Sequence, residues 1–200
     1  ASDNASDGVS LIQTAEGALN EAHSILQRMN ELATQAANDT NTSSDRSAVQ
    51  DELNALTSEI DRIASTTQFN TQNLLDGNFT GKNLQVGALE GQKISLTIAT
   101  MDAAALSIDS IKVSTFTDAG SAMTQIQHAI SSVSKQRSAL GAVQNRLEHT
   151  VANLDNVSEN TSSAESRIRD TDMAEEMVNY SKNNILAQAG QSMLAQANQS

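Results

Sequence analysis

An apolar stripe in the stretch from Leu11 to Ala36 constrains the fold of this chain more than any other feature. A second, shorter row formed by Leu11, Ile25 and Leu32 lies one position before the stripe and makes the face too wide for a two-stranded zipper. The stretch therefore predicts a long helix, over about residues 5–37, that packs among several partners. The stripe itself follows alternating steps of three and four residues: Ile12, Ala15, Leu19, Ala22, Leu26, Met29, Ala33 and Ala36.

Two further stretches repeat the helical pattern. Thr42-Ser-Ser-Asp45 reads as a capping box that opens a second helix over about residues 44–66, and the short polar loop before it predicts an antiparallel helical hairpin. A third helix is expected over about residues 118–169, with Arg137 and Gln144 interrupting its apolar row. The helix-bundle core is then expected to contain Ile12, Leu19, Leu26, Met29, Leu53, Leu56, Ile60, Ile63, Ile126, Ile130, Val133, Leu140, Leu147, Val151 and Leu154.

The stretch between the second and third helices has a different period. Leu84-Gln-Val86 and Ile94-Ser-Leu96-Thr-Ile98 alternate with period two around a glycine-containing loop, which predicts a β-hairpin over about residues 83–99. The residues just before this hairpin read as irregular, and those from Met101 to Thr117 are expected to have little regular structure. The sequence therefore predicts a mainly α fold, an elongated bundle of long antiparallel helices with a small β-hairpin.

The last stretch of the chain is amphipathic but lacks an obvious partner. We expect a domain boundary at about residue 170, between a rod-like core of residues 1–170 and a separate helix in residues 171–200 that is mobile when it is not assembled. Its apolar residues include Met177, Val178, Tyr180, Ile185, Leu186, Met193 and Leu194.

Composition and charge exclude several classes of protein. The absence of proline fits long helices, and the absence of cysteine excludes a disulfide framework and a thiolate metal site. A net charge of −12 disfavours binding to nucleic acid. No apolar run approaches the ~18 residues that span a bilayer, so no membrane partner is expected.

No pattern of catalytic or metal-binding residues stands out. The three histidines are far apart in sequence, and the calcium-loop-like start at Asp39 lacks the glycine and the glutamate that such a loop needs at Ser44 and Gln50. Nucleophile elbows, phosphate loops and zinc-protease motifs are missing. We predict no enzyme, no catalytic residue, no metal and no cofactor.

One flank of the first helix has two possible interpretations. Gln27, Arg28, Glu31 and Gln35 lie beside Leu32, and an arginine next to an exposed leucine is a frequent composition of interfaces. Alternatively, Leu32 only widens the core stripe and Arg28 pairs with Glu31 or with Glu21. The residues alone favour this structural interpretation.

Several long motifs, in the same order along the chain, resemble bacterial flagellins, the subunits of the flagellar filament. SLIQTAEGALNEAHSILQRMNELATQAANDT resembles the N-terminal core helix and its loop, and EIDRIASTTQFNTQNLLDG resembles the second helix and the exit from it. QRSALGAVQNRLEHTVANL and ENTSSAESRIRDTDMAEEM resemble the C-terminal core helix and its link to the terminal helix, NNILAQAGQSMLAQANQS. The resemblance implies the core domain without the N-terminal terminal-domain helix and without the last residues of the C-terminal one.

The resemblance also implies a location and partners. It implies a secreted, extracellular structural protein of the motile flagellum that forms a helical homopolymer, with an export chaperone on the C-terminal helix. The motif LQRMNELATQAAN resembles the stretch recognised by the flagellin-sensing Toll-like receptor, with Asn30 in place of a common arginine. The implied receptor-binding residues are Gln27, Arg28, Glu31, Leu32, Gln35 and Glu52.

Two alternatives remain open. A hook–filament junction protein would share the terminal helices and the general fold, although LQRMNELA and LGAVQNRLEHT are more typical of flagellin. A non-polymerising coiled-coil binding module, such as an adhesin, would be a different class of protein and would not need apolar terminal helices.

Overall fold

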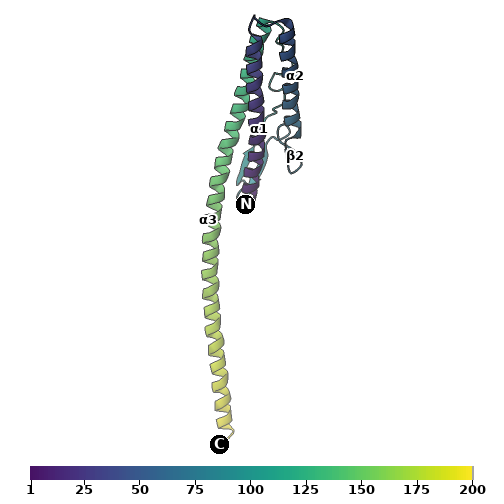
Figure 1. Cartoon of the computed structure of the whole chain (residues 1–200). Helices are drawn as coiled ribbons and strands as arrows, with labels where there is room; N and C mark the ends of the chain where they lie inside the picture. Colours follow the sequence, from purple (N-terminus) through teal and green to yellow (C-terminus); the bar gives the residue numbers. More distant parts are fainter. Residues whose placement is uncertain (200) are drawn as a thin grey trace. The chain divides into compact units, whose positions relative to one another are not determined.

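The computed structural model describes residues 1–199, which are mostly helical (Figure 1). The elements, in chain order, are α1 (Ser2–Ala36), α2 (Ser43–Thr66), β1 (Gln68–Phe69), β2 (Gln72–Asn73), β3 (Lys82–Gln85), β4 (Lys93–Leu96) and α3 (Phe116–Ala197). The chain divides into a first unit, Ala1–Ala152, and a second unit that begins at Asn153. The predicted fold class, mainly α with a small β-hairpin, is confirmed.

The α1–α2 hairpin of the first unit is closed by polar contacts at its loop. Thr42 caps α2 through both bonds of a capping box: its hydroxyl accepts from the Asp45 N–H at 3.2 Å, and its own N–H donates to Asp45 Oδ2 at 2.8 Å. Arg46 Nε donates to the Ala36 carbonyl at 3.2 Å, which satisfies a carbonyl at the end of α1. The sequence of the loop therefore sets where one helix ends and the next begins.

The apolar stripe of α1 lies in one continuous core with residues of α2, α3 and the segment between them. All eight residues of the stripe are buried. Of the expected core, Leu56, Ile63, Ile130 and Val151 are only partly buried and pack against that core, and Leu154 is half-buried at the start of the second unit. The fully buried members of the expected set are Ile12, Leu19, Leu26, Met29, Leu53, Ile60, Ile126, Val133, Leu140 and Leu147.

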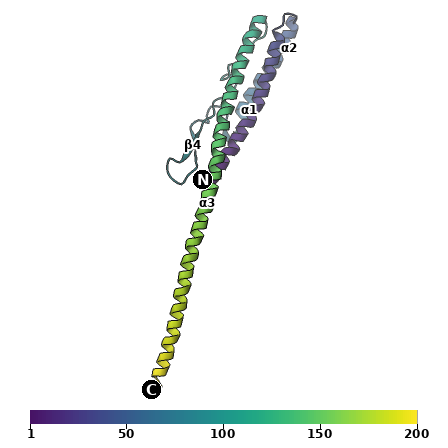
Figure 2. The same ribbon diagram turned by 90° about the vertical axis from the view of Figure 1, so that its left-hand side faces the viewer.

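Two small antiparallel hairpins follow α2. β3 pairs with β4 in a register that sets Leu84 opposite Ile94, so the expected hairpin forms but its strands are shorter than residues 83–99. Its loop projects to one side of the helices (Figure 2), but its strands pack against the first unit: Asn4 of α1 donates to the Gln85 carbonyl at 3.1 Å, and Ile94 and Leu96 are buried. The stretch after α2 is expected to be irregular, but β1 and β2 pair there in a second hairpin. The two strands can pair because Asn70 and Thr71 both adopt the left-handed conformation that a two-residue hairpin loop requires.

The stretch between β4 and α3 has no regular element, and side chains from α2 and α3 hold it in place. Gln50 of α2 donates to the Ile111 carbonyl at 2.9 Å and accepts from the Val113 N–H at 3.0 Å. Asp61, also of α2, accepts from the Ala103 N–H at 2.8 Å. These bonds satisfy backbone groups that would be paired with a neighbouring strand in a sheet, so the stretch can be buried without regular structure. Its buried residues include Ile98, Met101, Leu106, Ile108, Ile111 and Val113.

The structure differs from the sequence-based expectation in α3. A helix ending at about residue 169 and a separate helix from residue 171 were expected, but one helix runs from Phe116 to Ala197. No proline or glycine between Gly141 and Gly190 interrupts it. The units also meet at residues 152 and 153 rather than 170 and 171, because the helix contributes no buried residue beyond Leu147 and is exposed throughout residues 155–199.

Among residues 1–199, no helix is long and apolar enough to cross a membrane.

Candidate interaction surfaces

Two surfaces of the chain are candidates for binding other molecules. The α1–α2 patch consists of exposed polar residues near the helix loop: Gln27, Arg28, Glu31, Gln35 and Glu52. The apolar face of α3 consists of large apolar side chains in the second unit that are all more than half exposed: Val157, Ile168, Met173, Met177, Val178, Tyr180, Ile185, Leu186, Met193 and Leu194.

Arg28 is the centre of the α1–α2 patch. Its Nε donates to Glu52 Oε1 at 3.0 Å and its Nη2 lies 2.9 Å from the same oxygen, while its Nη1 donates to Glu31 Oε2 at 3.3 Å. The hydrogen bond to Glu52, followed by that to Glu31, raises the pKa of Arg28 above its usual value. The guanidinium therefore joins α1 to α2 while half of its side-chain surface, 51%, stays exposed.

The remaining patch residues lie on the same flank of α1, with one exception among the expected set. Gln27 Nε2 lies 3.1 Å from His23 Nε2, and the Gln35 carbonyl accepts from Asn41 Nδ2 at 2.6 Å. Leu32 is only 2% exposed and belongs to the core. The interpretation of Leu32 as an exposed interface residue is corrected here, because the second apolar row of α1 is covered by the rest of the bundle.

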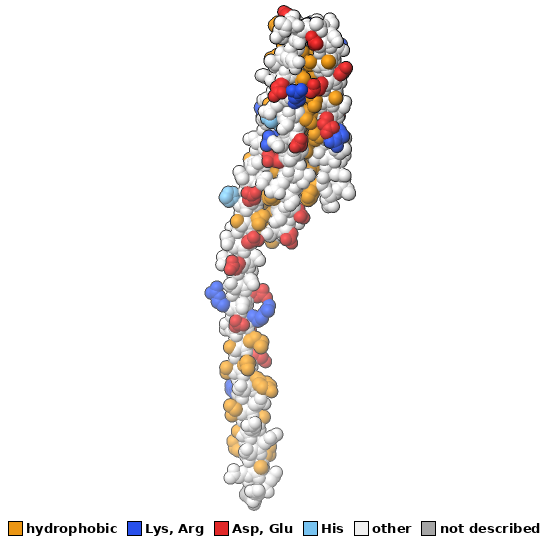
Figure 3. All heavy atoms as spheres, viewed as in Figure 1, with side chains coloured by type: hydrophobic (Ala, Val, Ile, Leu, Met, Phe, Trp, Pro, Cys, Tyr) orange, Lys and Arg blue, Asp and Glu red, His pale blue; other side chains and the backbone are white. Residues whose placement is uncertain are grey.

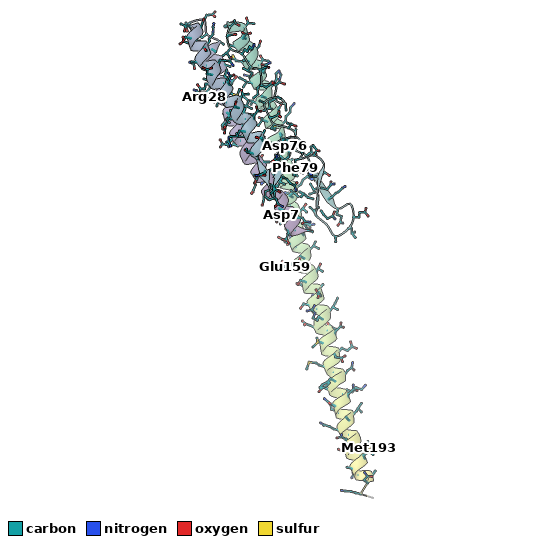
Figure 4. The ribbon with its side chains drawn as sticks, turned by 90° about the vertical axis from the view of Figure 1, so that its right-hand side faces the viewer. Asp7, Arg28, Asp76, Phe79, Glu159 and Met193 are labelled. Carbon is teal, nitrogen blue, oxygen red and sulfur yellow. The ribbon has the colours of Figure 1, made fainter. Side chains whose placement is uncertain are left out.

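The patch is separate from the polar residues around the β1–β2 hairpin. Figure 4 shows Arg28 on the part of α1 towards the α1–α2 loop, away from Asp7, Asp76 and Phe79. Asp76 accepts from the Asn78 N–H at 3.0 Å and from its amide at 2.9 Å, and these bonds lower the pKa of Asp76. They complete a local turn, so Asp76 has a structural role.

The apolar face of α3 has no neighbour in the described residues of the second unit. From Asp155 to Gln199 every residue is exposed, and Figure 3 shows hydrophobic side chains at both edges of the lower part of this stretch. Met177, Val178, Ile185 and Leu186 line a shallow apolar depression beside Ser181 and Lys182. Exposed large apolar side chains gathered in one stretch of a chain indicate a site of protein–protein interaction.

Metal-binding chemistry finds no support in the part of the chain that the structure describes. No group of three histidine, cysteine, aspartate or glutamate residues there could hold a metal ion. The calcium-loop-like residue Asp39 instead lies 3.4 Å from Arg46 Nη2, within the α1–α2 loop.

Comparisons with known proteins assign the chain to a family. The model of the bacterial flagellin N-terminal helical region matches residues 1–80, and that of the C-terminal helical region matches residues 123–200. The flagellin of Halalkalibacterium halodurans is 55% identical over 201 residues, which cover 100% of this chain and 74% of that protein. The chain belongs to the flagellin family.

Two further relatives agree with this assignment. The flagellin of Bacillus subtilis is 48% identical over 234 residues, covering 100% of this chain and 77% of that protein. A crystal structure of Bacillus cereus flagellin superposes with a TM-score of 0.69 at 32% identity, covering 76% of this chain and 89% of that one. Members of the family are structural, non-enzymatic subunits of the flagellar filament, an extracellular homopolymer, and this chain is such a subunit.

Sequence reasoning missed parts of both surfaces. It did not include Val157 and Ile168 in the apolar face, because each is a single apolar residue within a polar stretch. It placed Glu52 in the patch only by resemblance, and the contact of Glu52 with Arg28 depends on the packing of α2 against α1. A paired arginine and glutamate 24 residues apart leave no periodic signal in a sequence.

Proposed function

We propose that this flagellin assembles by burying the apolar face of α3 against the same segment of neighbouring copies. The observation that supports the proposal is the exposure of ten large apolar side chains in the second unit, from Val157 at 52% to Met193 at 73%. Burying one such side chain contributes about 1.5–3 kcal/mol, so a neighbouring helix stabilises the assembled form strongly. Subunits that contact each other head to tail without closing a ring form an open helical filament.

The test is polymerisation of the natural full-length protein, seeded with filament fragments in high salt and followed by electron microscopy. The double variant Ile185→Ser, Leu186→Ser is expected to give short filaments or none, because it removes two exposed apolar side chains without changing the first unit. Leu89→Ser is the matched control, since Leu89 is as exposed, at 68%, but lies in the loop between β3 and β4. Normal filaments from the double variant would refute the role of this face.

The second unit of the free subunit is mobile in this proposal. Residues 156–163 read Asn-Val-Ser-Glu-Asn-Thr-Ser-Ser, which are mostly poor helix formers, and all of them are exposed, so burial does not compensate for their low helix propensity. An export chaperone that covers the apolar face before assembly would prevent premature association. Binding of such a chaperone should protect the second unit from proteolysis, and a chaperone that left this unit accessible would refute the proposal.

The α1–α2 patch supports a second proposed role, as the surface that the flagellin-sensing Toll-like receptor recognises. An arginine with half of its surface exposed, flanked by two carboxylates and two glutamines, offers charged and amide groups to a polar partner surface. In this proposal Leu32, which is buried in the core, holds α1 in place beneath the patch residues and does not contact the receptor itself.

The test of this role compares matched variants in a receptor-binding assay. Arg28→Ala and Glu52→Ala are expected to weaken binding about tenfold or more, as loss of an interfacial arginine does. Arg62→Ala is the control, because Arg62 pairs with Glu59 on the surface of α2 away from the patch residues. Equal binding by all three variants, with unchanged helicity, would contradict the assignment.

The hook–filament junction protein and the coiled-coil binding module are not favoured by any feature of the two surfaces. The relatives described above are flagellins.

A further inference from the structure

The six methionines of the chain divide between the two units by exposure. Met29 and Met101, in the first unit, are 0% and 6% exposed, and Met123 is half-buried. On the apolar face of α3, Met173 is 58%, Met177 is 66% and Met193 is 73% exposed. Figure 4 shows Met193 on α3 near the end of the chain.

We propose that Met173, Met177 and Met193 form an oxidation site through which peroxides control assembly of the subunit. Hydrogen peroxide transfers one oxygen atom to the thioether sulfur of each residue. A sulfur–oxygen bond forms and the peroxide O–O bond breaks; the sulfur loses two electrons, and the departing hydroxide takes up the peroxide proton to leave as water. The product is methionine sulfoxide, which methionine sulfoxide reductases convert back to the thioether.

The exposure of these three sulfurs and the absence of cysteine make them the sulfur atoms of the chain that react fastest with peroxide. The chain has no cysteine, so no thiol competes for the oxidant. A sulfur buried in the core is shielded by its neighbours, whereas the three sulfurs of the second unit are open to solvent along one helix. The three residues are therefore the sulfur groups of this chain that react first.

Oxidation changes the chemistry of the surface on which it occurs. Met177 lies beside Val178, Ile185 and Leu186 in the apolar depression on α3. A sulfoxide there places a strongly polar S=O group in a surface that is otherwise apolar, and burying such a group without a hydrogen-bond partner is unfavourable. Oxidised subunits should therefore associate more weakly than reduced ones.

The inference rests on the proposed function, in which neighbouring copies bury this face. It then follows that the free subunit is sensitive to peroxide and that the assembled subunit is protected. The sulfurs react before assembly or not at all.

The first measurement is the rate of oxidation of each methionine in the purified free protein. The protein is treated with graded hydrogen peroxide, and the addition of one oxygen at each methionine is quantified by peptide mass spectrometry. Met173, Met177 and Met193 are expected to react roughly tenfold faster or more than Met29 and Met101. Equal rates at all of these residues would overturn the proposal.

The second measurement is seeded polymerisation before and after peroxide. Oxidation of the parent is expected to raise the concentration needed for polymerisation roughly tenfold or more, as loss of apolar burial at one methionine predicts. The triple variant Met173→Leu, Met177→Leu, Met193→Leu should polymerise like the parent and keep doing so after peroxide, because leucine matches methionine in helix propensity and apolarity. Met123→Leu, in the first unit, should remain as sensitive as the parent.

The outcomes separate this inference from the proposed function. If the parent polymerises and oxidation of its three exposed methionines leaves polymerisation unchanged, the inference is wrong and the proposed function stands. If the Ile185→Ser, Leu186→Ser variant polymerises like the reduced parent, the proposed function fails and control of assembly through this face fails with it. The selectivity of oxidation is measured independently in the free protein.

Discussion

At the scale of single residues, Gln50 shows how one side chain determines the path of an irregular stretch. Its side-chain amide, which is part-buried, donates to the Ile111 carbonyl and accepts from the Val113 N–H. We expect Gln50→Ala to lower the free energy of unfolding by about 1–3 kcal/mol, because two backbone groups lose their partner. Thermal unfolding should show this as a decrease of roughly 2–4 °C in Tm for each kcal/mol.

The control for this variant is Asn54→Ala. Asn54 accepts from the same Gln50 amide at 3.0 Å, but this bond is exposed. Its loss should change the stability by less than about 0.5 kcal/mol. If both variants were equally destabilised, the bonds of Gln50 to the irregular stretch would not be the cause.

At the scale of elements, the start of α2 couples stability to pH through Asp45. The hydrogen bond from the Thr42 N–H lowers the pKa of Asp45 below its ordinary value of 3.8. Because the pKa of Asp45 is lower in the folded chain than in the unfolded chain, its ionised carboxylate stabilises the folded chain. This stabilisation is complete when the pH is above the pKa of the unfolded chain, and it is lost as the pH falls through the pKa of the folded chain. Between about pH 5 and about pH 2.5, urea unfolding should therefore show a larger loss of stability for the parent than for Asp45→Asn.

Asp51→Asn is the control for the capping box, because Asp51 is an exposed acid in the interior of α2 rather than at its start. The acid-induced loss of stability in this variant should match that of the parent. A match between Asp45→Asn and the parent would instead show that the capping box does not contribute to the pH dependence.

At the scale of the whole molecule, the two units should differ in resistance to proteases. Twelve lysine and arginine residues are possible trypsin sites, and Arg167, Arg169 and Lys182 lie in the second unit. We expect brief treatment of the free chain to cut these three sites first, because the described residues of the second unit, 153–199, form no buried core that resists local unfolding. Mass spectrometry should then find a stable fragment that contains the first unit.

Assembled filaments provide the comparison for the proteolysis experiment. Burial of α3 between copies should protect the same three sites in the polymer. If the free chain were cleaved at Arg46 or Arg62 as fast as at Lys182, the first unit would not be more resistant to local unfolding than the second, and the prediction would be wrong.

The sequence by itself determined the features that depend on neighbouring residues. The stripe of α1 requires only the period of a helix, and the capping box of α2 only Thr42 and Asp45. The alternating apolar residues on both sides of a glycine-containing loop predict the hairpin of β3 and β4 and its apolar face, whereas the structure gives its register. The flagellin motifs likewise identify the family without any structure.

Only the tertiary structure decided which groups far apart in the chain meet. Leu32 could have faced solvent or the core, and its burial depends on how the bundle covers the second row of α1. The partner of Arg28 is Glu52 of another helix, and the anchors of the irregular stretch, Gln50 and Asp61, are 42 to 63 residues away from the groups they bind. Local propensity and periodicity carry no information about such pairs, because the contact forms only after the helices have packed.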